Sequence, residues 1–295
     1  MRVTGMMQNI QLLKNLRNIN TAMITGQQQL ATGQRINKPS DDPIGTGYQM
    51  RYDTDLARSQ EFLTNTQTGS EILKTMDSLM QQANDVLKRA RTLTLQAANG
   101  TYDLEQRQTI SAEIKQLREQ MVTIGNSTYN GRYLFNGQKT DQPPYTVAGA
   151  NGEQTDSGLF YLNVSPSVKV PVSITGEVVF GAANTDNVFK VLDDLSSALG
   201  SNNTSGISAA LDKIDACADR ISVSWAEIGA RTNRFDLMEN RITNDQVSLK
   251  EQRANVADVD VPNVIVDLKS KETVLQAALS TGARIMQTSL VDFLR

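Results

Sequence analysis

Apolar residues recur every three or four positions at both ends of this chain, and this spacing constrains the fold more than any other feature. Such a spacing places side chains along one side of an α-helix, as in the seam of a coiled coil. Both ends are therefore expected to be helices that pack against other helices. The stripe residues are Leu12, Leu16, Ile19, Met23 and Leu30 near the N-terminus, and Ile265, Leu268, Leu275, Leu279, Met286 and Phe293 near the C-terminus.

Prolines separate both stripes from the rest of the chain. Pro39 and Pro43 prevent one continuous helix from following the N-terminal stripe. Asp42 is expected to cap the next helix, with Pro43 as its first residue. At the other end, we expect the preceding helix to end at Val261–Pro262, where the C-terminal stripe begins. The two ends are therefore predicted to be separate assembly segments.

The same spacing predicts further helices between these breaks, at about residues 62–97, 110–124, 188–195 and 207–249. Asp103 is a plausible cap for the helix that carries the second of these stripes. At 1.5 Å per residue, the last stripe would need a helix about 65 Å long. Helices of this length with apolar stripes are typical of a helix bundle.

The period changes within residues 131–182, where turn-forming Asn-Gly and Pro-Pro pairs separate short apolar runs. Alternating apolar residues at 168–174 predict a strand, and the runs 159–162 and 177–180 are also read as strands. This segment is therefore expected to be a small β-rich insertion.

These expectations define a mainly α fold: an elongated antiparallel coiled-coil helix bundle formed by the N- and C-terminal parts of the chain, with a small β-rich insertion. The order of the elements is nearly symmetric, so the bundle closes if the two ends meet. The expected domains are an N-terminal assembly and export segment (1–43), a long-helix rod (44–130 and 183–256), a β-rich outer insertion (131–182) and a C-terminal assembly helix (257–295).

The composition argues against catalysis and against several classes of partner. The chain has no histidine, which is the commonest general base and metal ligand, and we expect no catalytic residues, metal or cofactor. The 29 basic and 32 acidic residues give a net charge of −3, so no nucleic-acid partner is expected. No apolar run is long enough to span a membrane, and no membrane insertion is expected.

Two local features leave alternatives open. Asp41 and Asp42 could bind a cation, but adjacent carboxylates seldom converge on one ion without further oxygen ligands, so capping is favoured. Cys217, the single cysteine, lies in a helical run, where a small core residue is favoured over a reactive thiol.

The segment from Leu30 to Pro43 (LATGQRINKPSDDP) resembles the N-terminal signature of the bacterial flagellin superfamily. The segments 98–101, 130–137, 228–231 and 258–295 are also similar to that superfamily, whereas the β-rich insertion matches it weakly. The signature residues are Arg35, Ile36, Asn37, Asp41, Asp42 and Pro43.

Within the superfamily, residues 1–7 and Pro43 resemble the hook–filament junction members more than the filament flagellins, which usually have alanine in place of Pro43. The resemblance implies a structural component of the bacterial flagellum that adapts the hook to the filament through its terminal helices. A major or minor filament flagellin is the alternative. A coiled-coil adhesin or receptor rod is the other class of interaction protein, and it should carry a secretory signal or a membrane span.

The resemblance also implies partners and a location. These are hook-associated protein 1 on the hook side, flagellin, further copies of this chain, and a cytoplasmic export chaperone that covers the C-terminal stripe before export. It implies a secreted protein that leaves through the flagellar type III channel and resides in the extracellular flagellum. No acidic residue precedes Asp41, which suits an export address at the N-terminus.

Overall fold

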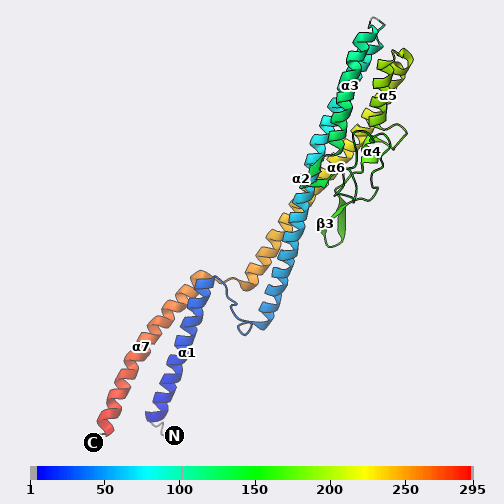
Figure 1. Ribbon diagram of the computed structural model, residues 1–295. Helices are drawn as coiled ribbons and strands as arrows, with labels where there is room; N and C mark the ends of the chain where they lie inside the picture. Colours follow the sequence, from blue (N-terminus) through cyan, green and yellow to red (C-terminus); the bar gives the residue numbers. More distant parts are fainter. Residues whose placement is uncertain (1–4, 101, 294–295) are drawn as a thin grey trace. The chain divides into compact units, whose positions relative to one another are not determined.

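The computed structural model describes the backbone of residues 5–100 and 102–293, and the side chains of residues 7, 9–100 and 102–283. The chain divides into two compact units (Figure 1). Unit 1 contains residues 1–58 and 245–295, and unit 2 contains residues 59–244. Unit 1 therefore combines segments from the two ends of the chain, whereas unit 2 is one continuous stretch.

Helices dominate the described chain, as predicted. The helices are α1 (Gly5–Thr32), α2 (Pro43–Ala98), α3 (Leu104–Gly125), α4 (Gly176–Phe180), α5 (Val188–Gly200), α6 (Thr204–Ala257) and α7 (Val261–Phe293). The strands form two antiparallel pairs, β1 (Thr128–Tyr129) with β2 (Arg132–Tyr133), and β3 (Tyr161–Ser165) with β4 (Val168–Pro171).

The predicted C-terminus of α2 and the predicted N-terminal cap of α3 are confirmed. Helix α2 stops before Asn99, and Asp103 caps α3. The Asp103 carboxylate accepts a hydrogen bond from the Gln106 amide at 2.9 Å, and the Gln106 side chain accepts one from the Asp103 amide at 3.2 Å. This reciprocal capping box satisfies two backbone donors that a helix start leaves unpaired.

The break before the C-terminal helix comes earlier than predicted. Helix α6 ends at Ala257 and α7 begins at Val261, so Pro262 lies inside the first turn of α7. Proline is tolerated there because the first amides of a helix have no partner within it. The Asp260 carboxylate accepts a hydrogen bond from the Asn263 amide at 3.3 Å and caps the new helix.

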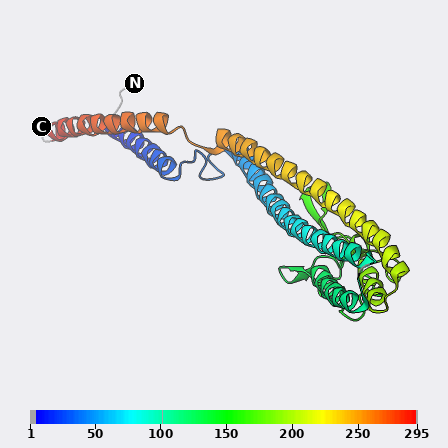
Figure 2. The ribbon, with the colours of Figure 1, turned by 90° about the horizontal axis from the view of Figure 1, so that it is seen from above.

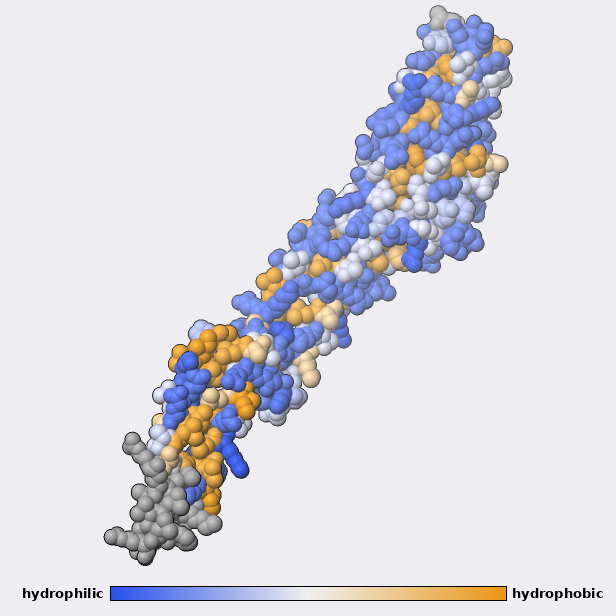
Figure 3. Space-filling model, turned by 60° about the vertical axis from the view of Figure 1, so that its left-hand side comes forward, coloured by the Kyte–Doolittle hydropathy of each residue, from blue (hydrophilic) through white to orange (hydrophobic). Residues whose placement is uncertain are grey.

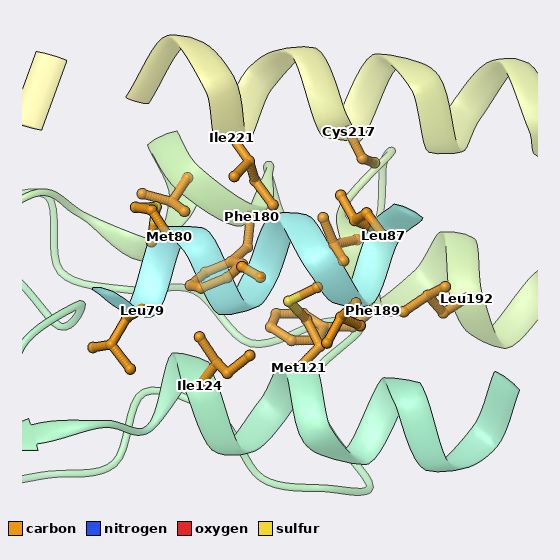
Figure 4. Close-up of a cluster of buried hydrophobic side chains, with 14 of the residues drawn as sticks. Leu79, Met80, Leu87, Met121, Ile124, Phe180, Phe189, Leu192, Cys217 and Ile221 are labelled. Atoms are coloured by element: carbon orange, nitrogen blue, oxygen red, sulfur yellow. The ribbon is translucent and has the colours of Figure 1, made fainter. Parts of the chain in front are cut away.

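The core of unit 2 lies where the predicted stripes of α2, α3 and α6 meet α5 and the insertion (Figure 4). Cys217 is 1% exposed, which confirms that it is a small core residue. Its burial raises the pKa of the thiol to about 11. The buried stripe residues include Met76, Leu79, Ala83, Val86, Ala90, Leu93 and Ala97 of α2, Ile110, Ile114, Met121 and Ile124 of α3, and Ile207, Ile214, Ile221, Ile228 and Phe235 of α6.

The strands of the segment 131–182 differ in position from those predicted. Residues 177–180 were expected to form a strand but lie in helix α4, and the strand expected over 168–174 ends at Pro171. Short apolar runs do not distinguish a strand from a buried helical turn. Here the helical turn places Val179 and Phe180 in the core, where the Phe180 ring packs against Phe135 with centroids 5.4 Å apart.

A buried arginine holds the end of unit 2 where α2 turns into α3. Arg107 is 3% exposed, and its guanidinium donates hydrogen bonds to the carbonyl oxygens of Ala97 and Asn99 and to the Asn202 side chain. These acceptors include carbonyls at the C-terminus of α2, which is the negative end of the helix dipole. Arg107 therefore joins the α2–α3 turn to the α5–α6 loop.

Replacing Arg107 should destabilise unit 2. Arg107→Met would remove the donor from these acceptors, among them the carbonyl of the buried Ala97, and we expect a loss of about 2 kcal/mol in the free energy of unfolding. Arg89→Met is the matched control, because Arg89 pairs with Glu113 at the surface and should cost less than about 1 kcal/mol. Urea unfolding followed by fluorescence of Trp225, the only tryptophan, reports on this unit. Equal losses in the two variants would contradict the structural role of Arg107.

A glycine allows α2 and α6 to approach closely in unit 2. A Cβ atom on Gly69 would lie 2.4 Å from the Phe235 ring, whereas nothing lies within 4 Å of a Cβ on Gly229 of α6. Gly69→Ala should therefore destabilise the unit by about 1–3 kcal/mol through overpacking. Gly229→Ala should stabilise it by up to about 1 kcal/mol, since alanine favours helix. The same urea experiment compares the two, and stabilisation by Gly69→Ala would disprove the close contact.

Candidate functional site

Helices α1 and α7 of unit 1 lie side by side and run antiparallel (Figure 1 and Figure 2). Two glycines fix the register. A Cβ on Gly26 would lie 3.3 Å from the Leu268 side chain, and a Cβ on Gly282 would lie 2.7 Å from the Leu12 side chain. These contacts pair an early residue of α1 with a late residue of α7 and the reverse, as an antiparallel arrangement requires.

The predicted stripe of α1 lines this contact. Its members are all half-buried and cover one side of the helix: Leu12, Leu16, Ile19, Met23 and Leu30.

The predicted stripe of α7 lies only partly in the contact. Leu268 and Leu275 are half-buried, but Ile265 and Leu279 are 47% and 54% exposed. Val264 and Ala278 are half-buried in place of these two residues. A straight helix turns about 20° per heptad relative to a strict seven-residue repeat, so a stripe read from sequence drifts around it. The side chains of Met286 and Phe293 lie outside the described residues.

Unit 1 leaves much of its apolar surface uncovered after α1 and α7 have paired. In the described part of this unit, Ile36 and Ala257 are the only apolar residues that are buried. Figure 3 shows hydrophobic surface gathered over the terminal helices. Large apolar patches on a monomer mark surfaces for association. The exposed apolar residues of these two helices are Met7, Ile10, Leu13 and Ile24 of α1, and Val261, Ile265, Val266, Val274 and Leu279 of α7.

A short antiparallel bridge joins the two chain ends where α1 stops and α6 ends. The Val259 amide donates a hydrogen bond to the Gly33 carbonyl at 3.1 Å, and the Arg35 amide donates one to the Ala257 carbonyl at 2.7 Å. Gly33 has a φ of +69°, a conformation that glycine adopts without strain. We call residues 33–36 with 256–259 the clasp.

Arg35 connects the clasp to the start of α2. Its guanidinium donates to the Val256 carbonyl at 2.8 Å and to the Asp42 carboxylate at 3.1 Å. Asp42 in turn caps α2 by accepting a hydrogen bond from the Gly45 amide at 2.9 Å, which confirms the predicted cap. This bond and, to a smaller extent, Arg35 lower the pKa of the Asp42 carboxyl below its ordinary value.

The other signature residues shape the loop between the clasp and α2. The Asp41 carboxylate accepts hydrogen bonds from the amides of Asn37 and Lys38 at 3.2 and 2.9 Å. Pro43 is the first residue of α2, as predicted. Asp42 therefore acts as the cap of α2, whereas Asp41 stabilises the loop that precedes it. In the part of the chain that the structure describes, no cluster of three or more histidine, cysteine or acidic residues could hold a metal ion.

Sequence reasoning missed the partners of this loop on the C-terminal side. Ala257 is fully buried, and Arg253 of α6 donates to the Asp53 carboxylate of α2 at 2.5 Å. Arg253 and Asp53 lie 200 positions apart in the sequence, so no local sequence pattern predicts their contact. The buried Ala257 is one small residue among several apolar residues in the run 254–261, so a single sequence does not distinguish it from its neighbours.

Unit 2 contains a groove of about 680 Å³ between α2 and the insertion. Its lining is mostly apolar and includes Ile72, Phe160, Leu162 and Val172, with Arg132 as its one charged residue. The lining contains no carboxylate, thiol or imidazole. Over the described residues, none of the helices combines the length and apolar character needed to cross a membrane.

Acid should loosen the start of α2. Because the pKa of Asp42 is lowered in the folded chain, its stabilising effect is complete at neutral pH and is lost as pH falls through the lowered pKa, below about pH 4. Asp42→Asn should keep a cap acceptor without this pH dependence, and Asp42→Ala should lose the cap at every pH. Hydrogen exchange of the Gly45 amide, measured by NMR on both sides of this pH, checks the prediction. Unchanged protection of Gly45 in Asp42→Ala would contradict it.

Comparison with known proteins places these features in a family. Models of the bacterial flagellin N-terminal and C-terminal helical regions match residues 3–140 and 211–294. The chain is 25% identical to flagellar hook-associated protein 3 of Salmonella typhimurium over 317 aligned positions that cover 100% of both chains. It is 24% identical to flagellin FlaB2 of Treponema pallidum, over 96% of each chain.

A solved structure shares the fold. The flagellar hook-associated protein-3 from Legionella pneumophila superposes with a TM-score of 0.63 at 15% identity, over 70% of this chain and 98% of that one. The matched family regions include α1, α7 and the clasp between them. Because the two family models together match more than half of the residues, this chain belongs to the bacterial flagellin family.

Proposed function

We propose that this chain is a structural component of the bacterial flagellum, the hook–filament junction protein that adapts the hook to the flagellin filament. The observation that carries the proposal is the α1–α7 pair of unit 1, whose described large apolar side chains are half-buried or exposed. Burial of apolar surface is the main force that stabilises a helix pair. Unit 1 therefore gains most of its stability when neighbouring subunits cover it.

The assembly segments are residues 1–43 and 257–295, and the predicted interface residues act in two ways. Those in the α1–α7 contact, such as Leu16 and Leu268, pair the two ends of one chain. Those that are exposed, such as Ile265 and Leu279, are available to neighbouring subunits. The signature residues around Arg35 and Asp42 position the pair at the ends of α2 and α6.

The partners follow from the junction role. Hook-associated protein 1 covers the terminal helices on the hook side, and flagellin and further copies of this chain cover them elsewhere. The chain is secreted through the flagellar export channel, and a cytoplasmic chaperone shields the C-terminal stripe before export, because an exposed apolar stripe invites premature association. The full-length similarity to hook-associated protein 3 of Salmonella supports this role.

A filament flagellin is the second candidate, supported by the similarity to FlaB2 of Treponema pallidum over nearly the whole chain. The two candidates differ in self-assembly. A flagellin polymerises alone into long filaments, whereas a junction protein forms only a short zone. Electron microscopy that locates the labelled protein in intact flagella separates them, because a label along the whole filament would support the flagellin.

Deleting the gene should leave hooks without filaments and release unpolymerised flagellin into the medium. The intact gene should restore filaments, and Ile24→Asp should fail to do so, because it places a charge on the exposed apolar face of α1. Val147→Asp is the matched control, an equally exposed valine in unit 2. Filament counts by electron microscopy and immunoblots of the medium measure the result. Normal filaments in the deletion strain would refute the junction role.

A further inference from the structure

Asparagine is followed directly by glycine at four places in unit 2: Asn99, Asn130, Asn136 and Asn151. This pair of residues favours hydrolysis of the asparagine side chain, because glycine has no Cβ to keep its backbone nitrogen away from the side-chain amide. The four asparagines have different surroundings in the folded chain, so their reactivities should differ.

Two of these asparagines are held by hydrogen bonds at both ends of the side-chain amide. The buried Asn136 donates to the Gln142 carbonyl at 3.1 Å, and its oxygen accepts a bond from the Asp156 amide at 3.2 Å. The Asn151 side chain makes two such bonds, at 3.0 and 3.1 Å, and the Gly152 amide also donates to a carbonyl at 2.9 Å. These side chains would have to give up their bonds before they could react.

Asn130 is exposed, but it lies in a tight hairpin turn. Asn130 and Gly131 connect β1 to β2 and have φ angles of +49° and +75°, which are typical of a two-residue hairpin turn. The pairing of Tyr129 with Arg132 closes this turn. Attack by the Gly131 nitrogen requires rotation about the bond between the Asn130 Cα and its carbonyl carbon, and the pairing opposes that rotation.

Asn99 has neither restraint. It follows Ala98, the last residue of α2, and both Asn99 and Gly100 are exposed. Among the described residues, neither the Asn99 side chain nor the Gly100 amide has a hydrogen-bond partner. The Asn99 carbonyl accepts bonds from the Tyr102 amide at 3.2 Å and the Arg107 guanidinium at 3.4 Å. These bonds polarise the peptide group and favour loss of the proton from the Gly100 nitrogen, which then attacks as an anion.

We propose that Asn99 is a site of spontaneous modification, at which the side-chain amide is converted to a carboxylate. The deprotonated Gly100 nitrogen forms a bond to the Asn99 Cγ and closes a cyclic imide. The bond from Cγ to the side-chain nitrogen breaks, and ammonia leaves with the proton. Water then adds to either carbonyl of the ring, and the C–N bond of that carbonyl breaks to give aspartate or isoaspartate at position 99. Nothing is oxidised or reduced, and water is the only other reactant.

The modification changes the charge of the α2–α3 turn that Arg107 holds. The new carboxylate lies at the C-terminus of α2, which is the negative end of the helix dipole, so the turn acquires a negative charge as the protein ages. The modification does not depend on the proposed junction role.

Peptide mapping of the full chain by mass spectrometry, after incubation in mildly alkaline buffer, tests the proposal. In the folded protein, Asn99 should be converted at least about tenfold faster than Asn136 and Asn151, because the loss of two hydrogen bonds readily supplies the barrier difference of about 1.4 kcal/mol. Asn130 should react at an intermediate rate. In urea the four asparagines should react at similar rates, because each then precedes a glycine in an unfolded chain.

Two glycine variants separate the effect of Gly100 from a general effect of substitution. Gly100→Ala should slow the conversion of Asn99 by about tenfold, because the added Cβ hinders the attack. The folded chain has room for this alanine, since nothing lies within 4 Å of a Cβ at Gly100. Gly229→Ala, at an equally open position of α6, should leave the rate unchanged. The proposal is overturned if Asn99 reacts no faster than Asn136 and Asn151 in the folded protein, or if Gly100→Ala leaves its rate unchanged.

Discussion

Unit 1 depends on the clasp, in which two backbone hydrogen bonds join residues 33–35 to residues 257–259. At this end the clasp acts together with the close contact of Gly26 with Leu268, because the other side chains between α1 and α7 are only half-buried. The clasp fixes where α1 ends and where α7 begins. From there, Gly26 and Gly282 allow the antiparallel contact to continue along the pair. The signature residues Arg35 and Asp42 connect this arrangement to the first turn of α2.

The two units differ in how fully their apolar helix stripes are covered by other helices. In unit 2, the stripes of α2, α3 and α6 meet one another and form a closed core. In unit 1, helices α1 and α7 alone do not surround an apolar side chain in their described part, and apolar residues on one flank face solvent. The same sequence pattern thus produces a buried core in unit 2 and an exposed apolar surface in unit 1.

Local chemistry was predictable from the sequence, and long-range contacts were not. The caps at Asp42 and Asp103 follow from residues within three positions of each helix start, and the structure confirms both. The side of α7 that meets α1 was less predictable, since Ile265 and Leu279 lie at its flank and Val264 and Ala278 in the contact. Of the partners of Arg35, Val256 and Ala257 lie more than two hundred positions away in the sequence. The run 177–180 fits a strand or a helix equally well without its packing partners.

The antiparallel register of α1 and α7 has a consequence for the order of events during synthesis. Leu12 meets Gly282, so the first helix has to wait for almost the last residues of the chain before it finds its partner. Closing so long a loop also costs more conformational entropy than closing the local contacts of unit 2. During synthesis, unit 2 can therefore fold first. Helix α1 stays without its partner α7, and accessible to other proteins, until translation has finished.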